Sequence, residues 1–258
     1  MQPQLRTVAS ASGTAAPMPA QLADKVIALQ ALLARIATHF PPATLASSLS
    51  IEDMVLTDAI LGGGHTIEIF TLDTGRMHAD TLALVDAIQR RYGFAVTLYR
   101  PDPQPVTHYV TVHGRDAFYE SVDLRKRCCE IRKVEPLKRA LAGKKAWLTG
   151  LRREQSTTRT QLELQSFDTV YSLEKFNPLA DWSEDEVWAY LRSNGVPYNA
   201  LYDQGYRSIG CAPCSRPVVT GEDVRAGRWW WEQAAGEAAQ ECGLHVGPDG
   251  KLVRTKNA

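Results

Sequence analysis

The chain has 258 residues, of which 44% are apolar and 22% are charged, and its 29 Lys and Arg residues equal its 29 Asp and Glu residues in number. This length fits one large domain or two small ones, and the composition excludes a disordered chain. No apolar run approaches the ~18 residues of a membrane span, and the zero net charge argues against a general binder of nucleic acid or membrane surfaces. We expect a globular protein with no nucleic-acid or membrane partner, either a monomer or a homo-oligomer.

Both ends of the chain are expected to lie outside the fold. Residues 1–20 are rich in Ala, Ser, Thr and Pro and lack the apolar stretch of an export signal, which predicts a disordered leader on a cytoplasmic protein. Residues 246–258 are polar and are expected to form a mobile C-terminal tail. A single domain is expected to span residues 21–245.

Hydrophobic periodicity predicts alternating helices and strands in the N-terminal part of the chain. Apolar residues recur at helical spacing from Leu22 to Ile36, which predicts a helix that the Pro41-Pro42 pair ends. The predicted elements that follow are a strand over 43–49, a helix from Glu52 to Gly62, a strand over 66–72, a helix from Leu82 to Gly93 and a strand over 94–99, closed by Pro101, Pro103 and Pro105.

The alternation continues in the second half of the chain. The predicted elements there are a helix over about 130–141, strands over 146–149 and 169–173, a helix from Ser183 to Asn194 that begins with a capping box to Glu186, a loop over 202–217 and a short helix at Trp229–Trp231. Alternating strands and helices predict an α/β fold, a mostly parallel twisted sheet with helices on both faces. In such sheets ligands bind beyond the carboxyl ends of the strands.

Two pairs of cysteines carry the strongest chemical signal. Cys211 and Cys214 form a C-x-x-C pair, and Cys128 and Cys129 are adjacent. Four thiolates can hold a structural zinc or an iron-sulfur cluster, and because adjacent side chains point apart, the Cys-Cys pair favours a 4Fe-4S cluster. The alternatives are zinc, or buried filler at the adjacent pair with a redox dithiol at the other.

The fifth cysteine, Cys242, lies between a glutamate and a glycine, with His245 three residues later. A thiol on a glycine-hinged segment near the end of the chain suits a nucleophile that moves between a substrate and a reductant. An unused surface thiol is the alternative, and spacing alone leaves both open.

The charges are unevenly distributed despite their zero sum. Residues 125–159 contain twelve Lys and Arg against three Asp and Glu, an excess of nine, which leaves the rest of the chain at 17 minus 26, or minus nine. Part of this basic stretch, 150–156, follows a predicted strand, so we expect it to face an anionic ligand. Arg225 and Arg228 add two cations just after the C-x-x-C pair.

Two strand ends carry candidate nucleotide-binding residues. The serine-rich segment 47–53 lies where a strand meets a helix, so its backbone N–H groups and hydroxyls can hold a phosphate or can simply cap the helix. The segment 71–76 ends the next strand and can contact a base and ribose, or form a plain turn.

Together these segments resemble the assimilatory phosphosulfate reductases, in particular the bacterial adenylyl-sulfate (APS) reductases that carry an iron-sulfur cluster. The resemblance covers about residues 43–245 and rests on 47–53, 71–76, 127–129 with Lys133, 150–153, 208–214, 225–231 and 241–245. It implies the PP-loop, or adenine nucleotide alpha-hydrolase-like, fold and a single nucleotide-binding reductase domain.

The resemblance implies reduction of APS to sulfite and AMP, with thioredoxin or a glutaredoxin-like protein as reductant, in sulfate assimilation toward cysteine. Cys242 would be the catalytic nucleophile and would carry an S-sulfocysteine intermediate. A 4Fe-4S cluster would be held by Cys128, Cys129, Cys211 and Cys214. The substrate-binding residues implied are Ser47, Ser48, Leu72, Lys133, Arg153, Arg159, Arg225, Arg228 and His245.

One residue departs from the family pattern. Ser50 stands where the family often has glycine, so the loop is expected to be strained there if this position needs a positive φ. The alternatives for function are reduction of the 3'-phosphorylated substrate (PAPS), an ATP-dependent tRNA sulfurtransferase of the same fold, whose paired loop glycines this chain lacks, and a non-catalytic zinc or iron-sulfur sensor module.

Overall fold

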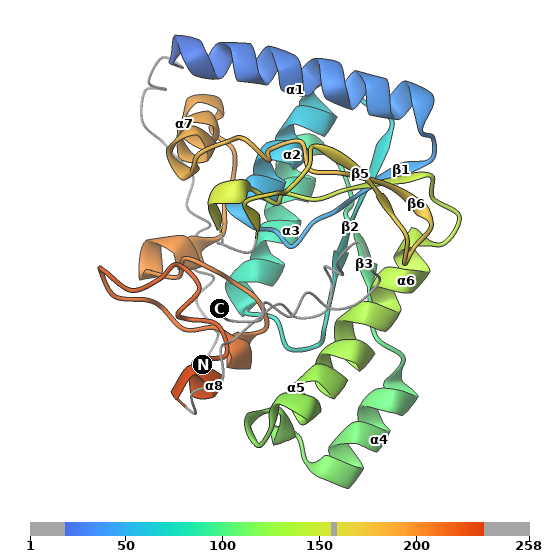
Figure 1. The fold of residues 1–258 in the computed structure, drawn as a ribbon, viewed down its shortest axis with the longest axis vertical. Helices are drawn as coiled ribbons and strands as arrows, with labels where there is room; N and C mark the ends of the chain where they lie inside the picture. Colours follow the sequence, from blue (N-terminus) through green and yellow to red (C-terminus); the bar gives the residue numbers. More distant parts are fainter. Residues whose placement is uncertain (1–18, 156–158, 235–258) are drawn as a thin grey trace.

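The computed structural model describes residues 19–155 and 159–234 (Figure 1). A six-stranded sheet forms its centre, in the order β3-β2-β1-β4-β6-β5, and every pairing is parallel except that of β5 with β6. The strands are β1 (Ala43–Ala46), β2 (Ile67–Leu72), β3 (Thr97–Tyr99), β4 (Ala146–Leu148), β5 (Gln165–Asp168) and β6 (Leu173–Phe176). The expected tail, Cys242 and His245 lie outside the described residues, as does nearly all of the expected leader.

Helices cover both faces of this sheet, which confirms the predicted α/β architecture. They are α1 (Ala20–His39), α2 (Ile51–Gly62), α3 (Ala79–Tyr92), α4 (Pro103–His113), α5 (Val122–Cys129), α6 (Glu135–Leu141), α7 (Glu184–Asn194) and α8 (Trp230–Ala234). A π-helical turn, Glu130–Val134, joins α5 to α6. None of the described helices has the length and apolar character needed to cross a membrane.

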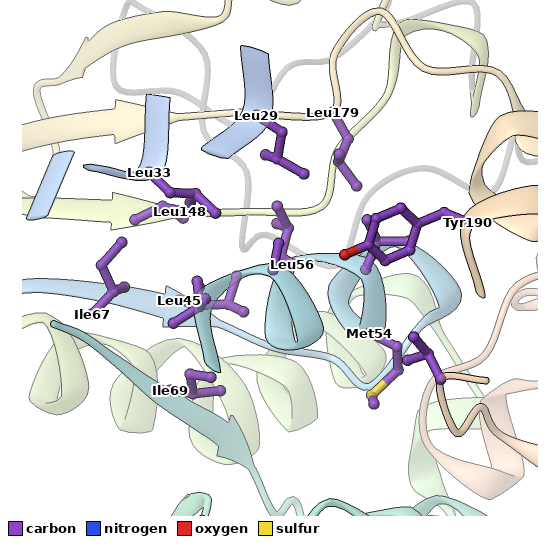
Figure 2. Packing of buried hydrophobic residues seen from close by; sticks show 14 of the residues in the cluster. Leu29, Leu33, Leu45, Met54, Leu56, Ile67, Ile69, Leu148, Leu179 and Tyr190 are labelled. Atoms are coloured by element: carbon purple, nitrogen blue, oxygen red, sulfur yellow. The ribbon is translucent and has the colours of Figure 1, made fainter. Parts of the chain in front are cut away.

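The larger core lies between the sheet and helices α1, α2, α3 and α7 (Figure 2). Successive strand residues point to opposite faces, so Leu45 and Leu148 enter this core while Phe70 and Trp147 pack with α6 on the other face. Both faces of the central strands are therefore buried along most of their length, which explains why their sequences are mainly apolar, although β2 includes the exposed Glu68. The carboxyl ends of β1, β2 and β4 are left together at one edge.

The structure corrects the prediction for the residues that follow β3. Prolines at 101, 103 and 105 were expected only to close that strand, but α4 begins at Pro103. Proline is well tolerated in the first helical turn because its missing N–H would have no intrahelical partner there. The Asp102 side chain caps the helix by accepting a hydrogen bond from Gln104 N at 2.9 Å.

Two further predicted boundaries differ from the observed ones. The helix expected from about residue 130 begins at Val122, where Ser121 accepts from Leu124 N, and it runs through the π-turn into α6. The strand expected over 169–173 is mostly the turn of the β5–β6 hairpin. Asp168 accepts hydrogen bonds from Val170 N and Tyr171 N, which stabilises that turn.

Candidate active site

A cavity of about 450 Å³ opens at the carboxyl ends of β1, β2 and β4, where the fold predicts a ligand. Seven of the residues that the resemblance implied for substrate binding line it: Ser47, Ser48, Leu72, Lys133, Arg159, Arg225 and Arg228. They come from five separate parts of the chain, so the fold brings together residues that are distant in sequence. Residues 150–152, after β4, and 207–210, before the C-x-x-C pair, complete much of the wall.

The serine loop in the wall of this cavity is held by its own side chains and by a distant tyrosine. Ser50 caps α2 by accepting from Asp53 N at 3.4 Å, and the Tyr202 hydroxyl accepts from Ile51 N at 3.3 Å. The expected strain at Ser50 is absent, because its φ is −71°, and the positive φ of 63° lies at the preceding Leu49. Ser50 therefore has an ordinary backbone conformation and also caps α2, so this position does not require glycine.

Asp53 ties this loop to the end of β4. Its Oδ2 atom accepts from Ser48 N at 2.6 Å and from Ser48 Oγ at 2.7 Å, while its Oδ1 atom accepts from Gly150 N at 3.1 Å. Burial raises the pKa of Asp53 from its ordinary 3.8 to about 6, although the hydrogen bonds from Ser48 act in the opposite direction.

The stability of the protein is expected to depend on pH through this carboxyl group. The folded chain holds the Asp53 proton more tightly than the unfolded chain, so between about pH 4 and pH 7 its ionisation lowers the free energy of unfolding by about 3 kcal/mol. An Asp53→Asn chain lacks this titration. Urea unfolding of both chains across that range checks the prediction, and a free-energy difference between them that is constant with pH would contradict it.

Gly150 is required where β4 meets the loop. A Cβ atom there would lie 2.5 Å from Asp53 Oδ1 and 2.8 Å from Glu52 Cβ, both on buried side chains. Gly150→Ala is therefore expected to lower the free energy of unfolding by about 1–3 kcal/mol, as overpacking does in other cores. Denaturant unfolding tests this. The solvent-facing Gly143→Ala chain controls for removal of a glycine in itself, although its φ of 76° adds some backbone strain.

The opposite side of the cavity is cationic. Lys133, Arg159, Arg207, Arg225 and Arg228 all line it. Arg228 is buried and is fixed by donating from Nε to Cys214 O at 3.1 Å, and Arg159 donates to Gln155 Oε1 at 2.6 Å. Such prearranged cations in a confined space are suited to an anionic ligand.

The neighbouring arginines Arg152 and Arg153 have different surroundings. Arg152, which was not predicted as a site residue, is buried in the cavity wall and pairs with Glu52 at 2.9 Å. Arg153, which was predicted, does not line the cavity; it pairs with Asp181 and donates to Leu162 O at 2.8 Å. Adjacent side chains leave the backbone in different directions, so one of the two turns inward and the other turns away.

The four cysteines that form the two pairs in the sequence line a second, smaller cavity. Cys128 and Cys129 come from the end of α5, and Cys211 and Cys214 flank the 3-10 turn Ala212–Cys214. Arg76, Arg125, Arg132 and Lys133 surround the same cavity. The structure therefore brings the two cysteine pairs to one cavity, with four cations beside four thiols.

Burial and the neighbouring cations shift the pKa values of these thiols in opposite directions. Burial raises the pKa of Cys214 to about 12 and also raises that of Cys128. Burial alone would do the same at Cys211, but the charge of Lys133 and a hydrogen bond with the Thr74 hydroxyl, whose oxygen lies 3.3 Å from Sγ, bring its pKa below the ordinary value. The thiol of Cys211 is therefore more readily ionised than those of Cys128 and Cys214.

The two cavities share a wall. Lys133, Cys211 and Trp229 line both of them. Within the described residues, no group of three or more His, Cys, Asp or Glu side chains is placed to hold one metal ion. The four thiols are therefore arranged around a space and do not converge on a single point.

Comparison with known proteins places this geometry in a family. Residues 42–217 match the phosphoadenosine phosphosulfate reductase domain. The chain belongs to the phosphoadenosine phosphosulfate reductase family. Among curated members of related sequence, the adenosine 5'-phosphosulfate reductase of Burkholderia cepacia is 52% identical over 91% of this chain and 93% of its own length. The enzyme of the same name from Neisseria meningitidis serogroup A is 54% identical over 87% and 91%.

Solved structures agree with this membership of the phosphosulfate reductase family. The phosphoadenylyl-sulfate (PAPS) reductase of Candida auris, in a phosphate complex, covers 80% of this chain and all of its own at 26% identity, with a TM-score of 0.64. The FMN adenylyltransferase of Candida glabrata shares the fold at a TM-score of 0.56 and 14% identity, over 86% of this chain and 76% of its own.

Proposed function

We propose that the chain reduces adenylyl sulfate to sulfite and AMP in the cytoplasm, with thioredoxin or a glutaredoxin-like protein as reductant, in sulfate assimilation toward cysteine. The observation that carries the proposal is the shared wall, because it joins a cationic nucleotide-sized cavity directly to four clustered thiols. The names and high identity of the curated relatives support APS as the substrate.

The proposed reaction begins with the thiolate of Cys242, which attacks the sulfur of the sulfo group. The bond between that sulfur and the bridging phosphate oxygen breaks, AMP leaves with the electron pair, and Cys242 holds the group as S-sulfocysteine. A reductant thiolate then attacks Cys242 Sγ and releases sulfite, and the second reductant thiol resolves the mixed disulfide. The reductant dithiol supplies both electrons, and its oxidation to a disulfide balances the reduction of sulfate to sulfite.

The residues of the larger cavity have distinct roles in this proposal. Lys133, Arg159, Arg225 and Arg228 would neutralise the phosphosulfate and the charge that develops on the departing phosphate. Ser47, Ser48 and Leu72 would contact the nucleoside at the strand ends. His245 is proposed to lie beside the nucleophile. Arg153 is left out of the substrate-binding set because its side chain is engaged elsewhere.

The donor set fits a 4Fe-4S cluster better than a single zinc ion. A cluster presents four irons, whereas a zinc ion needs four ligands directed at one point. The thiols surround a cavity, and the buried Arg125 Nη1 atom at its edge has no oxygen acceptor among the described residues, so it remains available to balance anionic sulfur. When bound, the cluster would supply fixed charge beside Lys133 and hold the two cysteine pairs together.

Anaerobic purification followed by iron and acid-labile sulfide analysis, with thioredoxin-dependent sulfite release measured from APS and PAPS side by side, tests the function. We expect iron and sulfide in equal amounts and faster release from APS. A zinc-only protein that releases no sulfite from APS would contradict the proposal, and release from PAPS alone would shift it to that substrate.

A further inference from the structure

A buried ion pair connects the helix that ends in the adjacent cysteines to the last described helix. Arg125 in α5 donates from Nε to Glu232 Oε1 and from Nη2 to Glu232 Oε2, the second contact measuring 3.1 Å. The two side chains are only 3% and 4% exposed, and Glu232 lies in α8. A two-pronged contact of this kind fixes orientation as well as distance.

The same guanidinium group faces the four-cysteine cavity. Arg125 lies one helical turn before Cys129 and lines that cavity. Although burial alone lowers the pKa of Arg125, the Glu232 carboxylate and the neighbouring Cys129 together raise it, so the charge is retained. Arg125 thus contacts the cysteine site with one part of its side chain and α8 with another.

Trp229, the residue before α8, extends this connection to the larger cavity. Its ring lies 4.6 Å from the guanidinium carbon of Arg125 and 4.6 Å from that of Arg228, so the indole is held between two cations. Its φ of 46° is unusual for a bulky residue and persists only where the surroundings hold it in place. The start of α8 is therefore set by contacts to both cavities.

We propose that Arg125 is a positioning residue that fixes α8 against the four-cysteine site. Glu232 precedes Cys242 by ten residues in the sequence, so the place where α8 is anchored determines where the following segment starts. This inference rests on the proposed function only for the role of Cys242. The anchoring of α8 by Arg125 stands on the described contacts.

Two variants disrupt the Arg125–Glu232 ion pair in different ways. Glu232→Gln keeps the shape of the side chain but leaves Arg125 without its counter-charge. The double variant Arg125→Met, Glu232→Leu removes both charges, a change that buried pairs often tolerate without loss of folding. Glu222→Gln is the matched control, because it breaks the exposed Arg216–Glu222 pair just before α8.

Three quantities separate positioning from simple support: iron per chain, hydrogen exchange of the α8 amides, and sulfite release per iron-loaded chain. We expect Glu232→Gln, which keeps Arg125 beside the thiols, to retain iron within about twofold. We expect both variants to exchange the α8 amides about tenfold faster and to lose about 100-fold in kcat per iron-loaded chain with little change in KM, because a displacement of about 1 Å can cost that much in rate. The control should match the wild type.

Two results would overturn the proposal. One is a kcat per iron-loaded chain within twofold of wild type in the double variant, and the other is unchanged exchange of the α8 amides in both variants. If the wild type released no sulfite from APS, the proposed function would be wrong, while the exchange measurement would still decide whether Arg125 anchors α8.

Discussion

A Cys242→Ser chain is expected to bind AMP and keep its iron but to release sulfite about 10⁴–10⁶-fold more slowly, the loss seen when other covalent enzymes lose their nucleophile. The hydroxyl of serine is far less acidic than a thiol, so it supplies far less of the anionic nucleophile at neutral pH. Single-turnover mass spectrometry with APS checks the step itself. The wild type should gain a sulfo group on the peptide that contains Cys242, and the variant should not.

The matched control replaces a cysteine of the smaller cavity. Cys214→Ser removes a thiol from the smaller cavity, so it should lose iron as well as activity. Opposite iron contents in the two variants would separate the nucleophile from the ligands. A Cys242→Ser chain that releases sulfite as fast as the wild type would contradict the proposed chemistry. A wild type that holds iron but releases no sulfite would favour the sensor-module alternative.

Replacing Lys133 is expected to give the second-largest effect. Lys133 lies on the π-turn after α5, lines both cavities and lowers the pKa of Cys211, and in the proposed reaction it would face the anionic substrate. Lys133→Met keeps most of the side-chain length and removes the charge, so kcat should fall about 10²–10³-fold, the usual cost of one preorganised electrostatic contact. Steady-state sulfite release at several APS concentrations separates this from an effect on KM alone.

Two companion variants sharpen that measurement. Lys138 lies on α6, a few residues after Lys133, and its exposed side chain lines neither cavity. The Lys138→Met chain should therefore have the kcat of the wild type. Lys133→Arg retains the charge and should recover part of the rate. A Lys133→Met chain with unchanged kcat would show that the shared wall has no electrostatic role.

The strand–helix alternation was predictable from sequence because buried strands and amphipathic helices have clear periodicities. The errors arose where local and tertiary signals conflict. Prolines after β3 resemble a stop, yet Pro103 opens a helix, and the polar segment 165–168 pairs as an edge strand without an apolar pattern. Edge strands depend on a neighbour for their hydrogen bonds, so their own sequence indicates them poorly.

The candidate site was predictable to the extent that it depends on residue type. Cysteine pairs and cations near strand ends identified most of the cavity walls. The sequence could not predict that Arg152 lines the cavity and Arg153 does not, because this depends on which side chain turns toward Glu52. The link between Arg125 and Glu232 joins residues 107 positions apart, and no periodicity signals such a pairing.

The shared wall also bears on how the protein withstands oxygen. Cys211 faces both cavities, so a nucleotide in the larger one covers the side of this thiol that solvent would otherwise reach. Thiolates are the species that oxidants attack, and the surroundings of Cys211 hold its pKa below the ordinary value of a thiol. We therefore expect a bound nucleotide to shield this thiol, so that oxidation at Cys211 is faster in the nucleotide-free protein.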